Sequence, residues 1–169
     1  MADVADVALR PVEDADLPAI FEQNRDPESV RMAAFTPEDP DDRTAFDRRM
    51  ARTRASRDNT LFAVTLDGRL VGTVAGFVMD DRLEVTYWID RSVWGQGVAG
   101  RALALLLDAV PDRPVYARAA SDNLGSLSVL RKAGFTATGT EISYATARRT
   151  EIEETILRLG QDSDRRRRS

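Results

Sequence analysis

The sequence contains no cysteine and no histidine, and its only lysine is Lys132. These absences exclude disulfides, thiolate nucleophiles, zinc fingers, Ser-His-Asp triads and histidine proton shuttles. The longest apolar run, Ala102–Leu107, is far shorter than the roughly 20 residues that a membrane helix needs. The first residues are acidic, where a secretory signal would be basic. We therefore expect a cytoplasmic protein with no membrane partner and no metal site, whose chemistry uses carboxylates, hydroxyls, backbone dipoles, arginines or a cofactor.

Length and charge indicate one acidic domain. The chain has 169 residues, of which 43% are hydrophobic and 31% charged, typical of a single globular domain. Net charge is −4, and without Arg165–Arg168 the body has 20 basic against 28 acidic residues. A nucleic-acid-binding domain would be basic, so no nucleic-acid partner is expected. We predict one domain over 1–160 and a disordered arginine-rich tail over 161–169, with an anchor to an anionic surface as the alternative for the tail.

The first half of the chain is predicted to change from helices to strands. Helical patterns span the region after Asp14 and a second stretch that runs to about Arg57, separated by the acidic, turn-rich segment Thr36–Asp42. Three strands are then predicted, with an Asp67-Gly68 turn between the first two: Leu61–Leu66, Arg69–Met79 and Leu83–Ile89.

The second half is predicted to alternate helices and strands. A helix from Val98 to about Ala109 is apolar almost all the way round, which predicts burial. The remaining elements are a strand at Val115–Ala120, a helix capped by Asn123 and closed by Gly134, and a late hairpin of strands at about 140–147 and 151–159. The predicted fold class is α+β: a single domain with a mixed, mostly antiparallel central sheet flanked by helices.

The segment Trp94–Arg101 is the most informative one for function. Its glycines allow a ligand to approach the backbone, and the free amides that begin the following helix form a phosphate site. Arg101, a cation in the first helical turn, opposes the helix dipole, which indicates an anion nearby. Two alternatives stay open here: a simple tight turn, or a dinucleotide fingerprint Gly95-x-Gly97-x-x-Gly100 with Asp122 as the acidic partner.

Three motifs in order resemble the GCN5-related N-acetyltransferase (GNAT) family, and within it the RimJ/RimL-like ribosomal-protein branch. They are Tyr87–Asp90 followed by Trp94–Ala99, Ser121–Ser126 followed by Val129–Phe135, and the hairpin Asp67–Gly72. The similarity extends over about residues 9–159. One departure is Trp94, which stands where the family's pyrophosphate motif usually begins with Arg or Gln.

The resemblance implies acetyl-CoA as the cofactor. The pyrophosphate would lie on the helix amides, the pantetheine arm along a splayed strand edge, and the Ile89 N–H would stabilise the oxyanion. Asn123 would contact the arm or only cap its helix. The full set of cofactor-binding residues that this implies is Tyr87, Trp88, Ile89, Trp94, Gly95, Gln96, Gly97, Val98, Ala99, Gly100, Arg101, Asn123 and Ser126.

The resemblance also implies two catalytic residues. A thioester is already activated, so an amine can attack it directly once a base accepts its proton. Glu84 occupies the place of a family glutamate base, although it is equally a solvent-facing strand carboxylate. Leu130 stands where many relatives have a tyrosine acid, and Ser126, one turn earlier, is the substitute acid or a simple first-turn residue. Further carboxylate candidates lie in the late hairpin, most of them expected to be surface charges: Glu141, Glu151, Glu153 and Glu154.

The expected function is transfer of an acetyl group from acetyl-CoA to a primary amine in a ternary complex. The acceptor, a peptide N-terminal α-amine or a small-molecule amine, would lie between the first two helices, the acidic loop Pro37–Asp42 and the late hairpin. The acidic body suits a cationic acceptor. The alternative is a non-catalytic CoA-binding sensor or interaction module, motivated by the missing tyrosine acid and the unproven base. A homodimer is left open.

Overall fold

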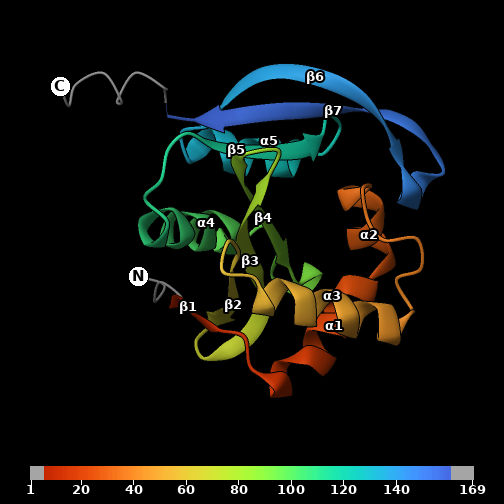
Figure 1. Ribbon diagram of the computed structural model, residues 1–169, viewed down its shortest axis with the longest axis vertical. Helices are drawn as coiled ribbons and strands as arrows, with labels where there is room; N and C mark the ends of the chain where they lie inside the picture. The colour runs from red at the N-terminus through yellow and green to blue at the C-terminus, as the bar shows by residue number, and fades with distance from the viewer. Residues whose placement is uncertain (1–5, 161–169) are drawn as a thin grey trace.

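The computed structural model describes residues 6–160, which form a seven-stranded sheet with helices on both of its faces (Figure 1). The strands are β1 Val7–Pro11, β2 Thr60–Leu66, β3 Arg69–Met79, β4 Arg82–Ile89, β5 Val115–Ala120, β6 Thr136–Ala145 and β7 Thr150–Leu159. The α-helices are α1 Leu17–Arg25, α2 Pro27–Ala33, α3 Arg43–Ala55, α4 Val98–Ala109 and α5 Leu124–Lys132.

The sheet has the order β1-β2-β3-β4-β5-β7-β6, and every neighbouring pair is antiparallel except β4–β5. The β2–β3 hairpin turns at Asp67 and Gly68, which have positive φ of 51° and 83°. This left-handed conformation is the one that Asp-Gly sequences favour in two-residue hairpins. The predicted fold class, a mixed and mostly antiparallel α+β domain, is therefore confirmed.

Two hydrophobic cores lie on opposite faces of the sheet. Helices α4 and α5 cover one face, where Leu103, Leu106 and Leu130 pack against strand residues such as Val74 and Leu157. Helices α1 and α3 cover β2 and β3 on the other face through a second core. Short helix α2 leads to the far end of the sheet, where Ala34, Ala120 and Ala145 pack together. The packing of helices on both faces of the sheet brings side chains of distant segments together.

The first third of the chain is not wholly helical as predicted. Strand β1 begins the described part of the chain and pairs with β2, with Val7 opposite Leu66. It is a short edge strand, so its alternation extends over too few residues to be distinguished from a loop. The first helical region is also two helices, because Asp26 caps a new helix at Pro27 by accepting from the Ser29 N–H at 3.0 Å.

Helix α4 is buried against the sheet, as its apolar composition predicted, but along one face only. Its buried face contains Val98, Ala102, Leu103, Leu106 and Leu107, whereas Arg101, Ala104, Leu105 and Asp108 are exposed. Alanine and leucine occupy both faces of the helix. Its apolar composition therefore did not show which face is buried and which is exposed.

The late hairpin is longer than predicted, since its strands extend over Thr136–Ala145 and Thr150–Leu159. Most of β6 is exposed on both faces, as an edge strand of the sheet (Figure 1). The predicted arginine-rich tail, 161–169, lies outside the described residues. No helix within residues 6–160 is long and apolar enough to cross a membrane.

Candidate active site

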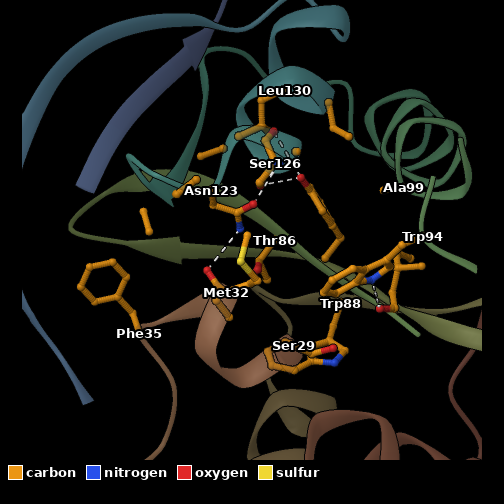
Figure 2. A pocket seen from close by; sticks show the side chains of 18 of the residues that line it. Ser29, Met32, Phe35, Thr86, Trp88, Trp94, Ala99, Asn123, Ser126 and Leu130 are labelled. Carbon is orange, nitrogen blue, oxygen red and sulfur yellow. Dashed lines mark hydrogen bonds between the residues drawn. The ribbon is translucent and has the colours of Figure 1, made fainter. Parts of the chain in front are cut away.

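The site lies where β4 and β5 separate. These parallel neighbours pair at only two positions, Leu83 with Val115 and Glu84 with Tyr116. Beyond Glu84 the two strands diverge, and a cavity of about 770 Å³ lies between them. Its walls come from β4, the loop before α4, the beginnings of α4 and α5, the helices α1–α3 and β7. Figure 2 shows Trp94 and Ala99 at the right of the site, Ser126 and Asn123 at its upper part, and Met32 directly below Asn123, with Phe35 at the left.

The free edge of β4 presents backbone groups to the cavity. The Asp90 N–H donates to the Val71 carbonyl at 2.7 Å, so residue 90 faces β3. Because successive residues of a strand point their hydrogen-bonding groups to opposite sides, the Ile89 N–H faces the open edge. The Ile89 carbonyl on the same edge accepts from the Trp94 indole N–H at 2.8 Å. Tyr87, Trp88 and Ile89 all line the cavity, as predicted.

The loop from Trp94 to Gly97 delivers the chain to the beginning of α4. Gly95 and Gly97 have φ of +77° and +78°, a conformation that L side chains rarely adopt. Gly97 is the N-cap residue, and the amides of Val98, Ala99 and Gly100 form the first turn, where they have no intrahelical partner. Both glycines and the three residues of the first turn line the cavity.

Open space lies beside the glycines of this loop and of the first turn of α4. A Cβ built on Gly95, Gly97 or Gly100 would meet no atom within 4 Å. By contrast, a Cβ on Gly72 would lie 2.2 Å from the Trp88 carbonyl oxygen, so that glycine is required by strand packing. Free amides at the positive end of α4, next to unfilled space, fit a phosphate or diphosphate group.

Two predicted cofactor residues stand apart from this cavity. Gln96 and Arg101 are exposed and are not among its lining residues. Arg101 lies on the solvent face of α4, a position that follows from the helical phase of the buried Val98 and Ala102. The remaining predicted cofactor residues are brought together as expected.

The beginning of α5 forms the opposite wall. Asn123 caps the helix, since its Oδ1 accepts from the Ser126 N–H at 3.2 Å, and its Nδ2 donates to the Met32 carbonyl at 3.3 Å. The predicted cap is confirmed, and the second bond joins the beginning of α5 directly to α2 at the wall of the cavity (Figure 2).

The hydroxyl of Ser126, the predicted acid, forms a hydrogen bond with the phenol of Tyr87. The Ser126 and Tyr87 hydroxyl oxygens are 2.6 Å apart, and either can be the donor. Burial raises the pKa of Tyr87 above its usual value, and the bond to Ser126 opposes this rise. The phenol therefore stays protonated at neutral pH. The helix position occupied by Leu130 lacks a tyrosine hydroxyl, but β4 supplies one beside Ser126.

The two carboxylate candidates Glu84 and Glu154 lie on the same face of the sheet, together with Arg118. Glu84 is 5% exposed and is not among the cavity-lining residues. It lies where β4 and β5 are still paired, and its Oε1 accepts from Arg118 Nε at 3.0 Å. The same guanidinium donates to Glu141 at 3.0 Å. Glu154 lines the cavity and is 8% exposed.

The pKa of Glu154 is raised by its surroundings. Burial raises its pKa above the usual glutamate value; Arg118 opposes the rise, and the nearby carboxylates Glu141 and Glu84 add to it. A carboxyl with a raised pKa is a stronger proton acceptor once ionised. Sequence reasoning included Glu154 only among four hairpin carboxylates. Strand parity could have narrowed the choice, because Glu151 and Glu153 are exposed and Glu141 is on the edge strand.

The dinucleotide interpretation is wrong for this chain. A dinucleotide-binding fold needs a parallel sheet with the glycine loop directly after its first strand. Here the sheet is mostly antiparallel, and the loop follows β4 and a short 3₁₀ turn at Arg91–Val93. Asp122, the expected acidic partner, instead pairs with Arg148.

A splayed parallel strand pair beside a helix N-terminus with free amides fits a protein that binds a phosphate-containing ligand along a strand edge. The chain matches the model of the acetyltransferase (GNAT) domain family over residues 6–136, so it belongs to that family and is an acetyltransferase. The predicted family is confirmed. No curated protein sequence matches the chain significantly.

Three solved structures illustrate the similarity of fold. RimL, a ribosomal-protein alpha-N-acetyltransferase in complex with coenzyme A, has a TM-score of 0.78 at 16% identity, covering 94% of this chain and 96% of that one. Spermidine N-acetyltransferase from Vibrio cholerae, with CoA and spermine, has 0.79 at 16%, covering 90% and 94%. RimJ from Mycobacterium smegmatis, with CoA-disulfide, has 0.77 at 23%, covering 93% and 83%. At these identities the likeness concerns the fold and leaves the acceptor open.

Proposed function

We propose that this protein transfers an acetyl group from acetyl-CoA to a primary amine by direct attack in a ternary complex. The observation that carries the proposal is one continuous cavity with a phosphate cradle at the beginning of α4 and a buried carboxylate, Glu154, in its wall. Structural neighbours that hold CoA in the same fold support this choice of cofactor.

The cofactor contacts follow from the geometry. The amides of Val98, Ala99 and Gly100 would hold the diphosphate, and the free edge of β4 would hold the peptide-like pantetheine arm. The Ile89 N–H then donates to the thioester carbonyl oxygen as negative charge builds on it. This amide is fixed by the sheet, so its donation requires no reorganisation during the reaction.

Glu154 is the proposed base. The amine nitrogen forms a bond to the acetyl carbon, the C–S bond breaks, and the amine proton passes to the Glu154 carboxylate. Deprotonating an α-amine at pH 7 costs about 1 kcal/mol, but a lysine amine costs about 4–5 kcal/mol. The departing thiolate takes a proton from Ser126, which takes one from the Tyr87 hydroxyl 2.6 Å away. Solvent then reprotonates Tyr87, and Glu154 releases the amine proton to solvent.

The non-catalytic alternative was motivated by the missing tyrosine acid and the unproven base. The Tyr87–Ser126 pair and the buried Glu154 support the catalytic function instead. Two measurements test the proposal. Calorimetric titration with acetyl-CoA should give saturable binding at one site. Thiol release with a panel of amines should then show turnover, and a thiol reagent reports only free CoA because the protein contains no cysteine. Absence of acetyl-CoA binding would overturn the cofactor assignment, and binding without release by any amine would favour the sensor.

A further inference from the structure

The acceptor side of the cavity is strongly apolar. Phe21, Phe35 and Phe46 line it, together with Met32 and the loop prolines Pro37 and Pro40. Figure 2 shows Met32 and Phe35 on the α2 side, across the cavity from Ser126. The same cavity must also admit the pantetheine arm, which leaves room for a compact acceptor. These walls favour an acceptor with an apolar body.

Two buried polar atoms at this end have no partner. Asn24 Oδ1 on α1 and Thr36 Oγ1 after α2 are inaccessible to solvent and make no hydrogen bond among the described residues. Both residues line the cavity. A buried polar atom without a partner is costly, so a ligand that donates to it binds with a gain. An ammonium N–H of an acceptor can supply such a donor.

The charges of the wall argue against a polycation. Glu154 is the only carboxylate residue among the described residues that line the cavity. The predicted acidic loop does not add to it, because Asp41 pairs with Arg25 at 2.7 Å and Asp42 caps α3 through the Ala45 N–H. A second ammonium group would therefore find no counter-charge.

One cation of the wall is available to a ligand. Arg118 is already engaged by Glu84 and Glu141. Lys132 lies eight residues along α5 from Leu124, about 12 Å from the end that contacts α2. Arg49 on α3 lines the cavity near Phe46 and forms no ion pair with any residue between 6 and 160. A half-buried guanidinium of this kind is suited to bind a carboxylate.

Building on the proposed function, we infer that the acceptor is a small amino-acid-like amine: one amino group, an apolar body and a carboxylate that pairs with Arg49. The amino group lies toward Glu154 and the apolar body packs among the phenylalanines. A polyamine would present a cation to Arg49, and a peptide N-terminus of apolar residues would present only a neutral carbonyl.

The test compares matched acceptors. L-leucine, L-methionine and L-phenylalanine are each measured beside their carboxamides, with spermidine as the polycation. Binding to the protein saturated with CoA is measured by calorimetry, which does not depend on turnover, and kcat and KM are measured by thiol release. At least one acid should bind about tenfold more tightly than its amide, the factor expected for one charge-assisted hydrogen-bonded pair. Spermidine should not bind.

Arg49→Gln should erase this preference. KM for the acid should rise about tenfold with little change in kcat, and the values for the amide should not change. Arg48→Gln, which changes the exposed neighbour on the same helix, is the matched control and should behave as wild type. Arg49→Lys should restore part of the preference, because it keeps the charge but not the bidentate geometry.

The inference is overturned if amides bind as well as acids, if none of the three acids binds, if spermidine is preferred, or if Arg49→Gln changes only acetyl-CoA affinity. These results differ from a failure of the proposed function itself. In that case acetyl-CoA does not bind to the wild-type protein, or no amine of any kind releases thiol.

Discussion

Replacing Glu154 by glutamine tests the proposed base most directly. The variant keeps the size and hydrogen-bonding reach of the side chain but cannot accept the amine proton. We expect kcat to fall by about 10²–10⁴-fold, the usual contribution of a positioned base, with acetyl-CoA affinity unchanged. The loss should be larger for a lysine-like amine than for an α-amine, because the protonated lysine amine is harder to deprotonate by about 3–4 kcal/mol.

The pH profile gives a second signature. Burial raises the pKa of Glu154, so wild-type kcat/KM should fall as pH decreases through a value above the usual glutamate pKa. Glu154→Gln should lack this acid limb. The raised pKa also means that the folded state binds a proton more readily than the unfolded state, so wild-type stability decreases as pH rises through this range. The glutamine variant should therefore be at least as stable as wild type at neutral pH, as thermal unfolding will show.

Two further variants test whether the acid limb belongs to Glu154 or to another carboxylate. Glu153→Gln changes the exposed neighbour and should leave the profile intact. Glu84→Gln removes a negative charge that raises the pKa of Glu154, so the acid limb should persist and move to lower pH. If the limb instead disappears in Glu84→Gln and survives in Glu154→Gln, Glu84 is the base and the assignment to Glu154 is refuted.

Three further predictions concern the cradle, the acid and the scaffold. Gly100→Leu should raise stability by about 0.5–1 kcal/mol through helix propensity. It should also weaken acetyl-CoA binding at least about tenfold, because the side chain fills open space beside the amides that begin α4. An unchanged affinity in calorimetry would contradict the phosphate site. Ser126→Ala and Tyr87→Phe should each lower kcat about 10²-fold, and the double variant should lose little more, because the two hydroxyls act as one unit. Additive losses would mean independent roles. Asp16→Asn should destabilise the fold by about 1.5–3 kcal/mol above pH 4, because it weakens the Arg10 bonds at 2.7 and 2.8 Å. These bonds lower the pKa of Asp16, so their contribution to wild-type stability is lost as pH falls through that lowered value. Equal stability of the variant and wild type at pH 7 would contradict this.

Local chemistry made the central part of the fold predictable. The Asp67-Gly68 turn, the glycines before α4 and the Asn123 cap each need a particular backbone geometry, and each residue type signals that geometry directly. The resemblance to a family then placed the cofactor edge at Tyr87–Ile89, which lines the cavity as expected.

Long-range pairing made the rest unpredictable. Whether Glu84 or Glu154 reaches the cavity depends on where β4 and β5 stop pairing, and nothing in either strand's own sequence specifies that point. The partnership of Tyr87 and Ser126 likewise joins residues 39 positions apart. The acidic body was expected to suit a cationic acceptor, but the carboxylates of the loop at 37–42 are not among the residues that line the cavity.

The short pairing of β4 and β5 also explains how this chain can catalyse without histidine or cysteine. A carboxylate is a useful base near neutral pH only if its pKa is raised, and burial in the opening between the strands provides this for Glu154. An unneutralised Arg118 would cancel the effect, because a nearby cation lowers a carboxyl pKa. Glu84 and Glu141 engage that guanidinium at 3.0 Å each. On the proposed function, Glu84 is a positioning residue: it pairs with Arg118 where β4 and β5 are still paired, and Glu154 in the cavity wall is then able to accept a proton.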